Sequence, residues 1–132
     1  MSVPLLVAGS LALVAAGVHG VGGEVLVVRR LSPASLPGSR FGGPGMTKAM
    51  IQVSWHITTI AFLTVGVALV LSGSVLEGAV ARGVGVVAAG ASTGFAAVAM
   101  TGALLQGPRT LLRHGGPLAL TLIAVLAWAG LA

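Results

Sequence analysis

The stretch AMIQVSWHITTIAFLTVGVALVL, residues 49–71, decides the fold of this chain. Its 23 residues contain no Lys, Arg, Asp or Glu, and most of them are apolar. A helix of about 20 such residues spans the ~30 Å hydrocarbon core of a bilayer. The stretch therefore predicts a transmembrane helix.

Three further runs of similar length are free or almost free of charge, and they cover residues 4–28, 83–105 and 116–132. Transmembrane strands would show shorter segments that alternate apolar and polar residues, so these continuous runs indicate helices and not a barrel. The sequence predicts an all-α membrane protein, a single domain over residues 1–132 in which four transmembrane helices form an up-down bundle. Trp128 is placed to anchor the last helix at a membrane interface.

The composition excludes an ordinary soluble domain, because 56% of the 132 residues are hydrophobic, only 7% are charged and the mean hydropathy is +1.08. The absence of cysteine excludes disulfides, thiolate metal sites and thiol nucleophiles. The net charge of +5 does not indicate nucleic-acid binding, since the basic residues lie between the spans and form no stripe with interleaved aromatics.

The basic residues predict the orientation in the membrane. Residues 29–48 and the connection after residue 105 together carry six of them, whereas the connection after residue 71 carries only Arg82. By the positive-inside rule, the first and third connections are cytoplasmic and both termini lie outside a bacterial inner membrane. The loop 29–48 is expected to contact anionic headgroups or, alternatively, to gate the cytoplasmic ends of the first two spans. In the second connection, residues 74–77 (SVLE) have the pattern of a capping box.

Small residues recur every fourth position in two of the spans. They are Ala8, Ala12, Ala16 and Gly20 in the first span, and Gly85, Ala89, Thr93, Ala97 and Thr101 in the third, which also contains the GxxxG pair Gly90 and Gly94. Such ridges allow helix backbones to approach closely. The Gly90/Gly94 face is in addition a predicted contact with a second copy of the chain or with another membrane protein.

Ionisable side chains inside the apolar runs are the main indication of function, because such groups are costly in hydrocarbon. His19 and His56 lie ten and eight residues from the basic residues that bound the loop, about 15 and 12 Å along a helix, so they are predicted to share one layer. Glu24 and Gln52 are predicted to form a second layer ~6 to 7 Å from the cytoplasmic boundary. Because His19 and Glu24 are five residues apart, or about 140° around an α-helix, they are expected to flank a helix interface without both pointing at one partner.

Three chemistries suit a site built from His19, Glu24 and His56, with Gln52 and Trp55 as further candidate ligand-binding residues. A divalent metal takes two imidazoles and a carboxylate, a proton path uses the same acid and base groups, and a haem takes His19 and His56 as axial ligands. The sequence favours a membrane protein that binds or conducts a proton or divalent cation. The alternatives are an accessory or assembly subunit of a membrane complex and a haem-binding electron carrier. No serine has a base and acid arrangement, so the sequence favours a role other than that of an enzyme.

The first half of the chain resembles a family of small bacterial membrane proteins with four transmembrane helices and no established activity. The resemblance rests on Gly17-x-His19-x3-Gly23-Glu24, Arg29-Arg30, Leu36-Pro37, Arg40-Phe41 and Trp55-His56-x-Thr58. The position of Gln52 is usually basic in that family, so this chain departs from it there. The resemblance implies that His19, Glu24, Trp55 and His56 are the residues of the site.

Overall fold

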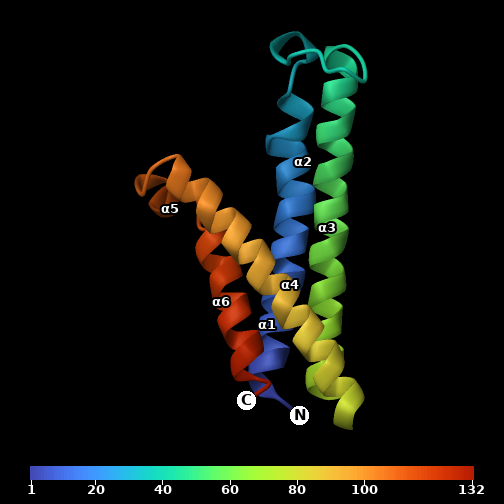
Figure 1. Ribbon diagram of the computed structural model, residues 1–132, viewed down its shortest axis with the longest axis vertical. Coiled ribbons are helices and arrows are strands. Elements are labelled where there is room, and N and C mark those ends of the chain that lie inside the picture. Colours follow the sequence, from blue (N-terminus) through green and yellow to red (C-terminus); the bar gives the residue numbers. More distant parts are fainter. The chain divides into compact units, whose positions relative to one another are not determined.

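The computed structural model describes the backbone of residues 1–132 and every side chain except that of Leu112, and this part of the chain is helical without β-strands (Figure 1). Three apolar helical segments, Val3–Arg30, Pro44–Ser74 and Gly78–Leu105, have 28, 31 and 28 residues. At 1.5 Å per residue they are about 42 to 46 Å long, which is more than the ~30 Å hydrocarbon core. The predicted membrane-protein character and helical class are therefore supported.

The fourth predicted span is shorter than expected. Its helix, α6 (Gly116–Ala129), has 14 residues, and the chain ends three residues later. The helix is about 21 Å long, so length supports three spans and does not by itself support a fourth. Pro117 lies in the first turn of α6, where its missing N–H costs no helical hydrogen bond.

The first helical segment changes its winding along its length. It consists of α1 (Val3–Gly17), the π-helix η1 (Val18–Gly22), α2 (Gly23–Leu26) and the 3-10 helix η2 (Val28–Arg30). The next connection contains only a short 3-10 turn, η3 (Pro33–Ser35), before α3 (Pro44–Ser74) begins. The first loop therefore ends at Gly43, which is five residues earlier than predicted, since Pro44 is well suited to a helix start.

The capping box predicted over residues 74–77 is wrong. Ser74 is the last residue of α3, and its hydroxyl donates to the carbonyl of Val70 at 2.6 Å. Helix α4 (Gly78–Leu105) begins after Glu77, whose side chain makes no capping hydrogen bond. The N–H groups of Val75 and Leu76 both bond the carbonyl of Leu71, so the end of α3 turns back on itself and leaves no serine free to cap α4.

The chain divides into two compact units, and the first comprises residues 1–15 and 63–132. Its core contains mostly small side chains, namely Leu5, Ala8, Ala12, Leu69, Ala88, Ala89, Ile123 and Ala127. Helices α4 and α6 run side by side within this unit (Figure 1), and the short helix α5 (Arg109–Arg113) precedes α6. The indole N–H of Trp128 donates to the hydroxyl of Thr93 at 3.0 Å and so joins α6 to α4.

The small-residue ridges provide the predicted close packing over part of their length, because Thr93, Ala97 and Thr101 of the third-span ridge are exposed. Ala8 and Ala12 are buried in the first unit, where a Cβ added at Gly9 would lie 2.8 Å from the carbonyl oxygen of Gly66. Gly85 and Ala89 are also buried in this unit. The backbones of neighbouring helices thus approach each other at glycine and alanine positions, which gives dispersion contacts in place of large side chains.

The second unit, residues 16–62, contains all five residues predicted to form the site. It consists of the end of the first helical segment from Ala16 onward, the loop, and α3 as far as Phe62. Ala16 is 1% exposed, as expected for the predicted ridge, and Val28 is equally buried. The candidate site can therefore be described within this unit alone.

Candidate functional site

The π-helix Val18–Gly22 sets the geometry of the candidate site. A π-helix closes its turns with i→i+5 hydrogen bonds, in place of the i→i+4 bonds of an α-helix, and such single turns are frequent at functional sites. The sequence here is VHGVG followed by Gly23, so three of six residues are glycines with little preference for α-helical geometry. Residues five apart in this wider turn come close to one face, and His19 and Glu24 are five residues apart.

His19 is held on α3 by a hydrogen bond to Thr59. The imidazole Nδ1 and the Thr59 hydroxyl oxygen are 2.9 Å apart. The hydroxyl of Thr59 also lies 3.1 Å from the carbonyl oxygen of Trp55, to which it donates its only proton. The hydroxyl oxygen therefore accepts from His19, and neutral His19 carries its proton on Nδ1 with Nε2 left as a proton acceptor.

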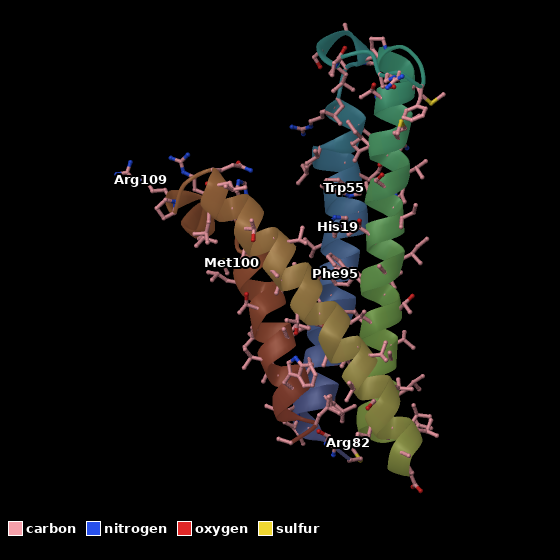
Figure 2. All side chains as sticks on the ribbon, viewed as in Figure 1. His19, Trp55, Arg82, Phe95, Met100 and Arg109 are labelled. Atoms are coloured by element: carbon pink, nitrogen blue, oxygen red, sulfur yellow. The ribbon has the colours of Figure 1, made fainter. Side chains whose placement is uncertain are left out.

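Trp55 holds both the ring and the backbone of His19. The indole and imidazole rings are stacked, with centroids 4.4 Å apart and planes 9° apart, and Figure 2 shows the two residues at the same level of neighbouring helical segments. The indole N–H donates to the His19 carbonyl oxygen at 2.9 Å, so α3 supplies a donor to a carbonyl of the π turn. Phe62 meets the imidazole edge-on at 5.3 Å.

Gly20 and Gly23 leave the space in which Thr59 and Trp55 pack against the π turn. A Cβ added at Gly23 would lie 2.6 Å from the indole Nε1 of Trp55, and one added at Gly20 would lie 2.7 Å from the Thr59 methyl carbon. Both distances are shorter than carbon and nitrogen atoms accept without displacement. The two glycines are required for the packing of Trp55 and Thr59 against the π turn.

Glu24 lies between the guanidinium of Arg29 and the imidazole of His56. Its Oε1 accepts from the Arg29 Nε at 3.2 Å, and its Oε2 lies 3.4 Å from the His56 Nε2, an ion pair when the imidazole is protonated. The Glu24 side chain is 16% exposed, against 47% for His56 and 71% for Arg29. Oε2 is buried and has no hydrogen-bond partner among the described residues, and the imidazole of His56 is the ionisable group that faces it.

The structure corrects the predicted pairing of layers. His19 was expected opposite His56 and Glu24 opposite Gln52, whereas His19 pairs with Thr59 and Glu24 pairs with His56. His19 and Glu24 both contact α3, as expected of residues that flank one helix interface, but the α-helical separation of about 140° does not apply to them. The physical reason is the π turn, which turns Glu24 back toward the helix that His19 faces.

The predicted three-ligand metal site is not assembled. Among the described residues, no group of three or more His, Asp or Glu side chains is placed to hold a metal ion. Of the proposed ligands His19, His56 and Glu24, only His56 and Glu24 form a pair, while the Nδ1 of His19 is bonded to Thr59. A haem between His19 and His56 also finds no gap, since the π turn and α3 are in direct contact at Gly20 and Gly23.

Phe62 and the backbone bond of Trp55 were missed by the sequence reasoning. One face of α3 carries Trp55, Thr59 and Phe62, which are spaced at i, i+4 and i+7. This spacing in the sequence is the pattern that could have identified them as a group. Arg29 contributes to the basic charge of the first connection and also forms an ion pair with Glu24.

The Gly90/Gly94 pair faces open space. A Cβ added at either glycine would meet no atom within 4 Å, and both residues are exposed. Contact with a second copy or a membrane-protein partner through this face stays a prediction.

Comparison with known proteins gives no family. No protein-family model, no curated protein and no solved structure matches the chain. The resemblance drawn from the motifs of the first half stays a prediction, and the function must be inferred from the site.

Proposed function

We propose that this protein takes up and releases a proton at an intramembrane site formed by Glu24 and His56, with Arg29 at the end of the site nearer the first loop. The observation that carries the proposal is the position of the Glu24 carboxylate, which is shared between His56 at 3.4 Å and Arg29 at 3.2 Å while its Oε2 lacks a hydrogen bond. A carboxylate and a protonated imidazole at this separation attract each other, so the two groups are placed to share a proton.

The two residues also differ in their access to the surroundings. Glu24 is largely covered, whereas nearly half of the His56 side chain is exposed. A proton that arrives at the imidazole therefore reaches the covered carboxylate over a single contact. His19 supplies a further proton acceptor at Nε2, because its Nδ1 hydrogen bond to Thr59 fixes the tautomer.

A proton fits this pair better than a divalent cation does. Structural and catalytic zinc sites use at least three protein ligands, and Glu24 and His56 are only two. The guanidinium of Arg29 on the same carboxylate also repels a second cation. Elemental analysis of protein purified without chelator tests this choice, and a stoichiometric metal lost in His56→Gln would reverse it.

The site is proposed to lie in a bacterial inner membrane, with four crossings and both termini outside. The distribution of basic residues, six to one between alternate connections, supports this orientation. Three helices are long enough to cross, and α6 would complete the even number of crossings that places both ends on one side.

Infrared difference spectroscopy against pH tests the proposal, because the chain has only two acidic side chains, Glu24 and Glu77. We expect a protonated-carboxyl band that Glu24→Gln removes and that Glu77→Gln, the matched control, retains. In vesicles, Glu24→Gln and His56→Gln are expected to abolish proton uptake while both variants keep their helical content. A carboxyl band and a proton uptake that survive in Glu24→Gln would disprove the proposal.

A further inference from the structure

The loop between the first helical segment and α3 contains a tight, fully bonded turn at residues 39–42. The N–H of Ser39 donates to the Gly42 carbonyl at 2.8 Å, and the N–H of Gly42 donates back to the Ser39 carbonyl at 3.1 Å. The N–H of Phe41 bonds the Ser39 hydroxyl oxygen at 3.3 Å. Arg40 and Phe41 form the tip of this turn.

Two contacts hold the turn against the start of α3. In Figure 1 the loop lies just beyond that end of the helix. The hydroxyl of Thr47 donates to the Pro37 carbonyl at 2.8 Å. Gly42 has a φ of 155° and packs so closely on the first turn of α3 that an added Cβ would lie 2.9 Å from the Met46 Cβ. The tip therefore has a fixed position relative to α3.

The tip combines an exposed cation with an exposed aromatic ring. Phe41 is 78% exposed, and Arg40 is exposed beside it. Removal of a phenylalanine side chain from water is favourable, so a rigid turn that displays one is suited to an apolar or interfacial environment.

The charges around the tip are of one sign. Between Glu24 and Glu77 the chain has four basic residues and no acidic one. Arg29 is paired with Glu24, which leaves Arg30, Arg40 and Lys48 without an acidic partner within residues 25–76. The loop therefore carries an uncompensated positive charge.

The loop also lies at the depth of lipid headgroups. If Lys48 marks the hydrocarbon boundary, the helix start at Pro44 lies four residues, or about 6 Å, above it. The interfacial layer on each side of a bilayer is about 5 to 7 Å thick, from the ~30 Å core and the ~40 to 45 Å total. The turn that packs on Pro44–Thr47 is thus at the level of the phosphates.

We propose that the loop docks on anionic lipid headgroups, with Phe41 inserted at the interface and Arg40, Arg30 and Lys48 bound to lipid phosphates. Anionic lipid adds an attraction for each basic residue near the surface, which corresponds to a roughly five-fold change in the docking equilibrium per charge. This inference is independent of the proton site, because it uses no titration of Glu24 or His56.

A fluorescent label next to the turn tests the proposal. The chain has no cysteine, so Gly38→Cys provides a single attachment point, and a Cβ at Gly38 meets its nearest atom at an ordinary 3.7 Å. The labelled full-length protein is reconstituted in vesicles of phosphatidylcholine alone or of phosphatidylcholine mixed with phosphatidylglycerol. Quenching by a headgroup nitroxide lipid and by aqueous iodide then reports the docked and undocked fractions.

We expect the label to be protected from iodide and quenched by nitroxide lipid when phosphatidylglycerol is present, and less so in high salt. Arg40→Gln and Arg30→Gln should each reduce the docking constant roughly five-fold, and Phe41→Ser should reduce it in both lipid mixtures. Arg82→Gln, which removes one positive charge elsewhere, is the matched control and should have no effect. Equal iodide access in both lipid mixtures, or an equal effect of Arg82→Gln and Arg40→Gln, would overturn the proposal.

Discussion

Deletion of Val21 is expected to be tolerated, although it shortens the helical segment between His19 and Glu24. Val21 is 71% exposed, so its removal sacrifices little packing. With the two residues four positions apart, an ordinary α-helix turns them through about 400°, which leaves them only about 40° apart and about 6 Å apart along the axis. The deletion thus exchanges one π turn for one α turn and keeps both side chains toward α3.

An insertion at the same place is expected to have the opposite effect. One alanine added after Val21 makes the spacing six residues, or about 600° of rotation, so Glu24 turns about 120° away from His56. The Glu24 carboxylate then loses its imidazole partner. Because it leaves a mostly covered polar group uncompensated, the insertion should cost about 1 to 3 kcal/mol, whereas the deletion should change the free energy of unfolding by less than about 1 kcal/mol.

The assay is reversible unfolding in detergent micelles, followed by helical circular dichroism, for both variants and for a matched deletion of Val14. Val14 is 64% exposed but lies in regular α-helix, so its deletion rotates the upstream residues Leu5, Ala8 and Ala12 by about 100° out of their core. We expect the Val14 deletion to be the most destabilising of the three changes. If the Val21 deletion destabilises the protein as much as the Val14 deletion, the assignment of the π turn as an extra residue in an otherwise regular helix is refuted.

Three further predictions concern the contacts of the π turn. Gly23→Ala should destabilise the protein by about 1 to 3 kcal/mol, because its methyl overlaps the indole of Trp55, whereas Gly17→Ala, which meets no atom within 4 Å, should be neutral or stabilising in the same unfolding assay. Trp55→Phe keeps a ring against His19 but removes the N–H···O bond, so we expect a loss of about 0.5 to 1.5 kcal/mol, and a loss above 3 kcal/mol would assign the effect to packing. In ¹⁵N-histidine NMR, neutral His19 should show the Nδ1–H tautomer in the native chain and a tautomer mixture in Thr59→Val, and an unchanged spectrum in that variant would contradict the hydrogen-bond assignment.

The fold was predictable where it depends on apolar run length. Residues 49–71 lie wholly inside α3, and the third span lies inside α4, because a long uncharged run leaves the chain no alternative to a helix in lipid. The ends were less predictable, since Pro44 extends α3 into the loop and α6 stops at Ala129. Capping at Ser74 failed because the helix before it continues through the serine, and a short pattern does not show where the preceding helix ends.

The residues of the site were predictable, but their pairing was not. Ionisable groups in apolar runs stand out by composition, so His19, Glu24 and His56 could be selected from the sequence. Their partners depend on helical phase, and the phase changes at a π turn that glycines permit but do not require. The π turn contains one more residue than an α-helical turn. Glu24 therefore contacts His56 and does not lie opposite Gln52, as had been predicted.

The bond between Trp55 and the His19 carbonyl bears on how the protein enters its membrane. Within the unit of residues 16–62, the partners of His19 lie on the second helix, about 40 residues further along the chain, and so does the imidazole that faces Glu24. During synthesis the first helix therefore emerges before the second helix, which supplies the partners of His19 and the imidazole beside Glu24. We expect the two helices to enter the bilayer together as a hairpin, with the bond from Trp55 to the His19 carbonyl formed as they pair.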